Sequence, residues 1–393
     1  MFHRRKFLAL LAVACLPCAG ANHAIAADEI VIGYAMAKTG PYVSLANTNE
    51  IAIDMAVEEV NAAGGINGKS IKLVKFDTAG DPKQAVLAVR KFAQDNNALA
   101  VIGPFSSSEC KVVFPAAERL GIVTMSMASS APNLAKPFKY AFRNTTGEGT
   151  IIKLVLESIK KRGLPASSAA IAHATDDTVS KIIGTKVLPS ILKGAGIAPK
   201  DVVTFKYAAF DLSPQVSKLL ENPTDLIGLG APPEAAIKLA KEMKRQGHNG
   251  RIFGGTTVAD VELPRRMDGA GNGMTIGTTF YEQLNDKTKA FGAEFTKRTK
   301  AAGMKRTVAN QFDASAYDIV YLFAAAMKAA GVTGDAAKLA SERTAIATEL
   351  AKIKKLDLLE GTISIADNKD ALKPIYILEV DGSGWALKDT IVR

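Results

Sequence analysis

The chain has 393 residues, of which 48% are hydrophobic, 22% charged and 6% aromatic. This composition excludes an intrinsically disordered chain and predicts one or two globular domains. The formal net charge is +10, but the lysines of apparent helices such as 238–245 have acidic residues between them. Such spacing indicates a solvated surface, so we expect no nucleic-acid partner.

The first 26 residues have the pattern of a cleaved export signal. The basic stretch "RRKF" is followed by the apolar run "LALLAVACL", and cleavage after Ala26 satisfies the A-x-A rule through Ala24 and Ala26. Arg4 and Arg5 also resemble a twin-arginine signal, so general secretion and twin-arginine export both stay open. No later segment approaches the ~20 apolar residues of a membrane span. We therefore expect an exported, soluble mature chain.

Short apolar runs rich in Val and Ile then alternate with segments of helical period. Up to residue 127 the predicted strands and helices alternate as 29–35, 49–62, 70–77, 82–94, 99–103, 109–120 and 122–127. The alternation starts again with a helix, as 149–162, 168–174, 179–194, 201–207, 213–220, 225–230, 233–247 and 251–255. This order is typical of parallel sheets covered by helices on both faces. The predicted fold class is α/β, with two doubly wound lobes joined by a hinge.

Small polar residues gather after two of the predicted strands. "GPFSSSE" (103–109) follows one strand, and "MASSAPN" (127–133) follows the next. Ligands of such sheets bind outside the carboxyl ends of the strands, and hydroxyl and N–H groups at a helix start favour an anion. Serines in these places also cap helices. A binding role and a capping role both stay open at this point.

Several motifs spread over nearly the whole mature chain occur together in one family. They are "AKTGPY", "AVEEVNAAGGINGK", "DTAGDPKQA", "VIGPFSSS", "GIVTMSMASSAPNL" and "FRNTTG". Together they resemble the type I periplasmic solute-binding proteins of the branched-chain amino acid (Leu/Ile/Val-binding) class. The resemblance implies a periplasmic protein without enzymatic activity that delivers a small-molecule ligand to the membrane permease of an ABC importer. It also implies two lobes that close on the ligand, and we expect a monomer.

The resemblance also implies how the chain is divided between the lobes. The first lobe would contain residues 27–146 and 279–359, and the second would contain 147–278 and 360–393. In this family the ligand carboxylate is held between the two serine-rich strand ends. The matching groups here are the hydroxyl of Ser107, the backbone of Ala128 and the hydroxyl of Ser130. Each hydrogen bond to a charged group is worth about 1.5–3 kcal/mol, so neutral donors can hold a carboxylate.

The second lobe departs from the pattern of the amino-acid binders. Thr178 stands where they have a Tyr, and Thr256 and Thr257 stand where they have the acid that holds the ligand's ammonium group. A closed cleft without a carboxylate partner strongly disfavours an ammonium group. Three nearby acids are candidates to replace the missing one: Asp176, Asp177 and Asp260.

These departures predict a ligand with a carboxylate and no α-ammonium group, such as an aromatic or aliphatic monocarboxylate or an oxo acid. An amino acid or a small amide is the alternative ligand, and a ligand-sensing partner of a membrane receptor is the alternative function. Tyr42 and Tyr281 are placed to stack on the ligand or to hydrogen-bond it, although both are equally compatible with half-buried loop aromatics.

The sequence carries no pattern of an enzyme. It has no G-x-G-x-x-G after the first strand, no G-x-S-x-G and no H-E-x-x-H. Cys110 is the single cysteine beyond the signal, and its place on an apparent helix favours a small buried hydrophobe over a nucleophile. We therefore expect no catalytic residue, no cofactor and no metal.

Overall fold

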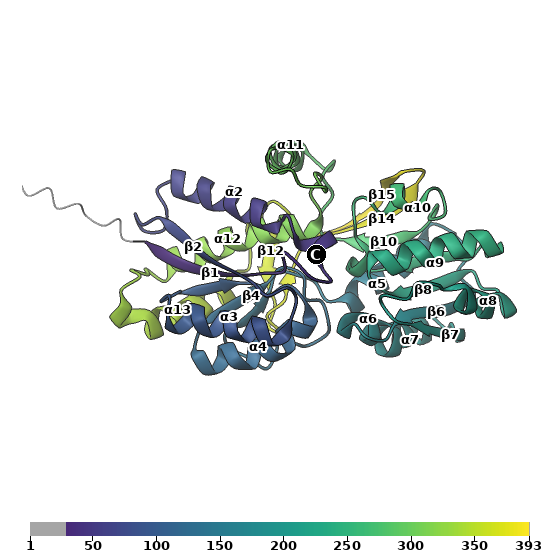
Figure 1. Ribbon diagram of the computed structural model, residues 1–393, viewed down its shortest axis with the longest axis horizontal. Helices are drawn as coiled ribbons and strands as arrows, with labels where there is room; N and C mark the ends of the chain where they lie inside the picture. Colours follow the sequence, from purple (N-terminus) through teal and green to yellow (C-terminus); the bar gives the residue numbers. More distant parts are fainter. Residues whose placement is uncertain (1–28, 393) are drawn as a thin grey trace, which may run out of the picture.

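The computed structural model describes residues 29–392, so the predicted signal at 1–26 lies outside the described residues. Two lobes lie side by side, each built on its own sheet, and the chain crosses between them three times (Figure 1). The two-lobed α/β prediction is confirmed. None of the helices within 29–392 combines the length and the apolar surface needed to cross a bilayer.

Lobe 1 is a five-stranded parallel sheet in the order β2-β1-β3-β4-β5. Its strands are β1 (Ile30–Met36), β2 (Ile71–Asp77), β3 (Ala100–Ile102), β4 (Val123–Ser126) and β5 (Ala141–Arg143). Its helices are α1 (Val43–Ala46), α2 (Asn49–Ala62), α3 (Pro82–Gln94), α4 (Ser107–Leu120), α11 (Asp286–Ala301), α12 (Gln311–Ala329), η3 (Ala336–Lys338) and α13 (Leu339–Lys352). Helices α2, α12 and α13 bury apolar residues on one face of the sheet, and α3 and α4 do so on the other.

Lobe 2 is a seven-stranded sheet in the order β15-β14-β10-β9-β8-β6-β7. Its strands are β6 (Ala169–Ala174), β7 (Pro199–Phe205), β8 (Leu226–Gly230), β9 (Arg251–Gly254), β10 (Thr275–Thr278), β14 (Ile375–Asp381) and β15 (Gly384–Ile391). Its helices are α5 (Glu148–Lys161), α6 (Thr178–Ile182), η1 (Ile183–Val187), α7 (Leu188–Gly194), α8 (Ser213–Glu221), α9 (Pro233–Gln246), η2 (Thr256–Val258) and α10 (Leu263–Met267). The sheet is mixed, because β14 and β15 form an antiparallel hairpin beside β10.

Helix α3 begins where local capping satisfies its first N–H groups. The side chain of Asp81 accepts hydrogen bonds from the backbone N–H groups of Lys83 and Gln84 at 2.8 and 2.9 Å, and Pro82 occupies the first position of α3. Proline has no N–H to lose there, and its fixed φ suits a helix start. The segment "DTAGDP" therefore acts as a turn and a helix start.

The third crossover between the lobes lies later than predicted. Strands β11 (Leu356–Leu358), β12 (Gly361–Ile365) and β13 (Ala371–Leu372) form a separate three-stranded sheet. Ile363 and Ile365 are buried in the core of lobe 1, and Asp370 forms an ion pair with the buried Arg143 at 2.6 Å. These contacts hold residues 360–372 on lobe 1, although the predicted division assigned them to lobe 2. The chain joins the second sheet only at Ile375.

Candidate ligand cleft between the lobes

A cavity of about 50 Å³ lies between the lobes at the carboxyl ends of β3 and β4. Lobe 1 lines it with Tyr42, Leu45, Phe105, Ser106, Ser107, Ala128, Ser130 and Phe312. Lobe 2 lines it with Asp177, Val179, Pro232, Thr256 and Thr257. The structure therefore brings together six of the eight residues that the sequence analysis selected, and leaves out Thr178 and Tyr281. Within residues 29–392, no Lys or Arg lines this cavity.

The serines of "GPFSSS" divide the capping and lining roles between them. Ser106 is the N-cap of α4, and its hydroxyl accepts from the N–H of Glu109 while the Glu109 carboxylate accepts from the N–H of Ser106 at 2.8 Å. Ser107 lies one residue further on and has no part in this capping box. Its hydroxyl contacts the Ser129 hydroxyl at 3.1 Å and accepts from the N–H of Ala131 at 3.3 Å. A single serine thus caps the helix, and Ser107 remains at the cavity wall.

Aromatic rings form the apolar wall of the cavity. The rings of Tyr42 and Phe105 lie 5.6 Å apart, and Phe105 meets Phe312 edge-on at 5.3 Å. Opposite them, Thr257 presents a buried hydroxyl oxygen that has no hydrogen-bond partner among the described residues. The cavity therefore combines an apolar surface with hydroxyl groups, which suits a small ligand with one apolar and one polar end.

Glu148 lies directly behind the cavity, and the sequence analysis did not identify it. Its side chain is 0% exposed. Its carboxylate accepts hydrogen bonds from the Ser130 hydroxyl at 3.1 Å, from the Thr256 N–H at 3.2 Å and from the Thr256 hydroxyl. Burial raises the pKa of Glu148 above its usual value, and these hydrogen bonds oppose the shift. The hydroxyls of Ser130 and Thr256 therefore already donate hydrogen bonds to an acidic side chain of the protein itself.

Gly255 makes the position of Glu148 possible. A Cβ atom at residue 255 would overlap Glu148 Oε2. An acid in the first turn of a helix is ordinary, because it complements the helix dipole. The available sequence signal was the glycine pair after β9 together with an acid between two glycines at 147–149.

The three acids considered as replacements lie in different surroundings. Asp177 lines the cavity, where its Oδ1 accepts from the Tyr42 hydroxyl at 3.2 Å and its Oδ2 caps α6. Asp176 accepts from the N–H of Tyr207 and lies outside the cavity lining. Asp260 is buried beyond η2, where burial raises its pKa, with Arg266 3.9 Å away. Asp177 is thus the acid of the three that reaches the cavity.

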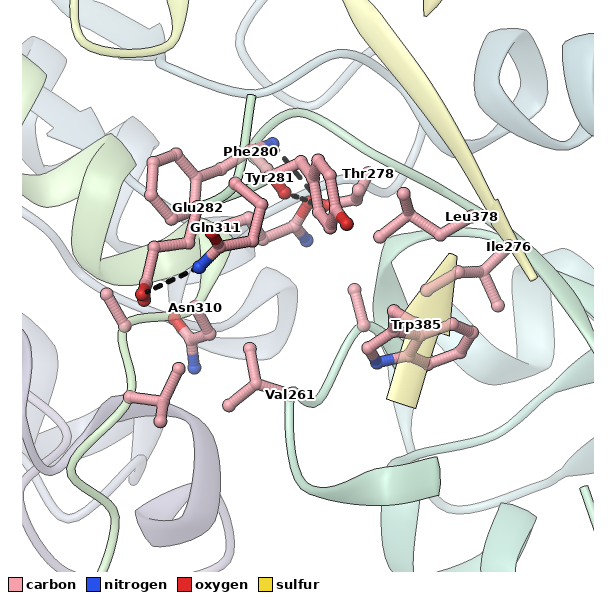
Figure 2. A pocket seen from close by; sticks show the side chains of 14 residues that line it. Val261, Ile276, Thr278, Phe280, Tyr281, Glu282, Asn310, Gln311, Leu378 and Trp385 are labelled. Atoms are coloured by element: carbon pink, nitrogen blue, oxygen red, sulfur yellow. Dashed lines mark hydrogen bonds between the residues drawn. The ribbon is translucent and has the colours of Figure 1, made fainter. Parts of the chain in front are cut away.

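Thr178 and Tyr281 are not among the residues that line the cavity. Thr178 begins α6, and its hydroxyl accepts from Ser108 of lobe 1 at 2.9 Å. Tyr281 lies in the crossover after β10, where it packs on the core of lobe 2. Figure 2 shows it at a separate cavity of about 180 Å³, together with Phe280 and Trp385. The crossover thus carries Tyr281 to this second cavity, so the structure does not support its predicted contact with a ligand in the cleft.

The lobes touch across the cavity. In addition to the Tyr42–Asp177 and Ser108–Thr178 hydrogen bonds, the Tyr207 hydroxyl of lobe 2 donates to the carbonyl of Pro41 in lobe 1 at 3.0 Å. These contacts define a closed arrangement in which a ligand would be enclosed.

The three crossovers meet at one buried ion pair on the hinge. Glu360 is 1% exposed, and its carboxylate pairs with the ammonium group of Lys373 in the third crossover. It also accepts from Asn144 of the first crossover at 3.4 Å and from Thr279 of the second at 2.5 Å. Asp318 accepts from the N–H of Glu360 at 2.9 Å, and burial with the nearby Glu360 charge raises the pKa of Asp318 to about 7.

The sequence is similar to known binding proteins. An amino acid binding protein of Pseudomonas aeruginosa is 27% identical over 250 residues, which are 63% of this chain and 65% of that protein. The Leu/Ile/Val-binding protein of Escherichia coli is 28% identical over 277 residues, which are 69% of this chain and 72% of that protein.

Solved structures share the fold at lower identity. The branched-chain amino acid transporter substrate binding protein of Streptococcus pneumoniae, in complex with isoleucine, matches with a TM-score of 0.78 and 20% identity over 93% of this chain and 99% of that one. A solute binding protein of an ABC transporter from R. palustris, in complex with benzoate, matches with a TM-score of 0.77 and 18% identity over 93% and 98%. The family described as periplasmic binding protein matches residues 29–385, which confirms the resemblance read from the motifs. The chain therefore belongs to the periplasmic binding protein family, a family of solute-binding proteins.

Proposed function

We propose that the protein is the periplasmic solute-binding component of an ABC importer and captures a small carboxylate-bearing ligand between its lobes. The observation that carries this proposal is the enclosed cavity at the ends of β3 and β4, where Ser107 and Ser130 face aromatic rings. The ligand carboxylate would accept from these hydroxyls and from the backbone N–H of Ala128. Its apolar part would lie against Tyr42, Phe105 and Phe312, where burial of apolar surface favours binding.

The proposed mechanism is closure of two rigid lobes about the hinge. A ligand that contacts both lobes stabilises the closed form over the open form, and only this difference in affinity moves the equilibrium. The hydrogen bonds between Tyr207 and Pro41 and between Ser108 and Thr178 would form in the closed state. The closed monomer would then dock on the membrane permease.

We propose a monocarboxylate or an oxo acid without an α-ammonium group as the first candidate ligand. Thr256 and Thr257 occupy the loop after β9, and the Thr256 hydroxyl is already bonded to Glu148. Relatives of the same fold hold isoleucine in one case and benzoate in another, so the fold is compatible with either class.

An amino acid is the second candidate, and Asp177 is the observation that favours it. The Oδ1 atom of Asp177 reaches the cavity and, among the residues that the structure describes, accepts only from the Tyr42 hydroxyl, so it can accept a further hydrogen bond. An ammonium group there would have an ionic partner. The two candidates therefore differ in a single group of the ligand.

A thermal-shift screen with matched ligands separates them. Leucine and 4-methylpentanoate differ only in the α-amino group, and so do phenylalanine and 3-phenylpropanoate. Benzoate with its neutral amide, benzamide, tests the carboxylate. A ligand that binds only the folded protein raises its melting temperature. We expect shifts with the carboxylates and none with the amino acids. The opposite result would replace the first candidate by the second, and no shift with any of these would contradict both.

The double variant Ser107→Ala, Ser130→Ala tests the site. Two hydrogen bonds to a carboxylate at about 1.5–3 kcal/mol each predict a loss of affinity of at least about a hundredfold. The melting temperature of the unliganded protein should fall, because Ser130 also donates to the buried carboxylate of Glu148, so affinity is measured at a temperature where the double variant is fully folded. Ser158→Ala is the matched control, since Ser158 is also buried but lies on α5 away from the cavity lining. Unchanged affinity in the double variant would refute the assigned cavity.

A further inference from the structure

Two hydroxyls that line the cavity share one acceptor. Ser130 comes from the loop after β4 in lobe 1, and Thr256 comes from η2 in lobe 2. Both donate to the same atom, Oε1 of Glu148. A hydroxyl carries a single proton and two lone pairs, and an ionised carboxylate can only accept. While Glu148 is ionised, both hydroxyl protons therefore point at Glu148. The two hydroxyl oxygens then present only lone pairs to the cavity.

Such an arrangement opposes the ligand that the cavity is proposed to bind. A ligand carboxylate needs hydrogen-bond donors. While the Ser130 hydroxyl donates its proton to Glu148, it can present only an oxygen lone pair to the ligand. The ligand charge would also lie close to a buried carboxylate, where like charges repel strongly because the local dielectric is low. Binding becomes favourable if Glu148 gains a proton, because its new O–H can donate to the Ser130 oxygen. The Ser130 proton is then free to turn to the ligand.

We propose that Glu148 takes up one proton from solvent when the cleft binds a carboxylate. Its protonation state thereby determines which ligands can form hydrogen bonds with the hydroxyls of Ser130 and Thr256. The inference rests on the proposed function and deepens it. The only covalent bond formed is the O–H bond of Glu148, and the proton comes from water or buffer. Glu148 is a positioning residue, since it acts on the ligand through Ser130 and Thr256.

The surroundings of Glu148 make it the group that takes the proton. Burial already raises its pKa, and among residues 29–392 no Lys or Arg is within ion-pair distance of its carboxylate. On its own helix, Lys153 and Glu157 are exposed and 3.6 Å apart.

The charged groups on the neighbouring elements have other partners. Arg143 at the end of β5 bonds Asp370 and the carbonyls of Ser129 and Ala131. Other charged groups on the elements around α5 include Asp177 across the cavity, Asp260 after η2, the Arg251–Glu379 pair between β9 and β14, and the Glu360–Lys373 pair of the hinge. The lysines of α5, η1 and α7 at positions 160, 161, 186 and 193 are exposed. None of these cations offsets the charge of Glu148, so protonation is the route that remains.

Calorimetry of benzoate and 4-methylpentanoate binding in two buffers of different ionisation enthalpy measures the proton directly. For the wild-type protein we expect uptake approaching one proton per ligand, and affinity that falls by up to about tenfold per pH unit as the pH rises above the pKa of Glu148 in the unliganded protein. In Glu148→Gln the amide N–H donates to a hydroxyl at every pH. That variant should bind the carboxylates without proton uptake and with an affinity independent of pH.

Asp177→Asn is the matched control, because Asp177 lines the same cavity and has no hydrogen bond to Ser130 or Thr256. It should keep the proton uptake of the wild type. Carboxylate binding without proton uptake in the wild type would overturn the inference and leave the proposed function intact. Loss of the uptake in Asp177→Asn together with its retention in Glu148→Gln would also overturn it.

An infrared measurement on the wild-type protein avoids any dependence on how Glu148→Gln folds. Benzoate labelled with carbon-13 in its carboxyl group shifts its own bands away from those of the protein. A protonated carboxyl band that appears on binding supports the inference, and its absence contradicts it. If neither benzoate nor 4-methylpentanoate binds in the thermal-shift screen, the proposed ligand class itself fails, which is a different result from binding without a proton.

Discussion

The protein buries two glutamates where its lobes meet, and the two have different partners. Glu360 on the hinge is 1% exposed and pairs with Lys373, with further hydrogen bonds from Asn144 and Thr279. Glu148 behind the cleft is 0% exposed and receives only hydroxyl and amide hydrogen bonds from the described residues. The hinge acid thus has a fixed countercharge, and the cleft acid has none.

This difference separates a structural charge from one that can change. Removing an ion from water costs several kcal/mol, and only a close partner with good hydrogen bonds recovers that cost. Glu360 has such a partner in Lys373, and the pair together with its hydrogen bonds ties the three crossovers together in this structure. At Glu148 it is partial, so the charge responds to protons and to what binds in front of it. The following variants test that contrast, beginning with the largest effect.

Lys373→Met should destabilise the protein most. It leaves Glu360 buried and unpaired beside Asp318, and breaking a buried pair by removing one partner costs about 3–5 kcal/mol. Equilibrium unfolding in urea measures the change. Lys352→Met is the control, because Lys352 is exposed and pairs with Glu349 on the surface, where an ion pair is worth about 0–1 kcal/mol. Equal effects of the two substitutions would contradict the role assigned to the hinge pair.

Gly255→Ala should destabilise the folded protein by about 1–3 kcal/mol, because the added Cβ would overlap Glu148 Oε2 in a tightly packed region. The backbone of Gly255 has a negative φ, so the expected loss comes mainly from the overlap with Glu148, with a further close approach of 3.1 Å to Ile152 Cγ1. The same substitution in a Glu148→Ala background should cost much less, and urea unfolding of the four proteins in this double-mutant cycle gives the coupling. Additive effects would show that Gly255 is not needed to make room for Glu148.

The sequence predicted the lobes and the position of the cleft, because both follow from local patterns. Alternating apolar runs and helical periods give parallel strands, and parallel strands bring their carboxyl ends to one edge. Ser107 and Ser130 follow adjacent strands, so their meeting at the cleft needed no knowledge of distant contacts.

Glu148 could not be predicted in the same way, because its burial depends on residues far away in the sequence. Its main partner, Thr256, is 108 residues away, and the contact exists only because α5 packs beside the end of β9. The third crossover was misplaced for a similar reason. The alternating pattern of "GTISIADNKDAL" suits a strand in either lobe, and only the Arg143–Asp370 ion pair and the burial of Ile363 assign it to lobe 1.

Glu148→Gln should change how stability depends on pH. Folding raises the pKa of Glu148, so the folded state binds more protons than the unfolded state above the usual glutamate pKa. Stability due to this group therefore falls as the pH rises through that window, by about 1.4 kcal/mol for each unit by which the pKa is raised. The variant lacks this term. We expect its melting temperature, minus that of the wild type, to increase as the pH rises above the usual glutamate pKa. Other buried acids such as Asp318 are present in both proteins and cancel in the difference, and a difference that is flat with pH would contradict the prediction.

Tyr207→Phe should have the smallest effect, and it acts on closure rather than on folding. The Tyr207 hydroxyl donates to the Pro41 carbonyl across the lobes at 3.0 Å, at an exposed position where a hydrogen bond contributes about 0.5–1.5 kcal/mol. Its loss should weaken ligand binding by about twofold to tenfold, because under the proposed mechanism the bond forms only on closure of the lobes.

Tyr140→Phe is the matched control for closure. The Tyr140 hydroxyl bonds to Thr344 at 2.7 Å within lobe 1, so this substitution should lower the melting temperature without changing ligand affinity. Calorimetric titration of both variants with a carboxylate that raises the melting temperature of the wild type separates the two effects. If Tyr140→Phe weakened binding as much as Tyr207→Phe, the affinity loss would come from lobe 1 itself, and the contact between the lobes would contribute nothing to capture.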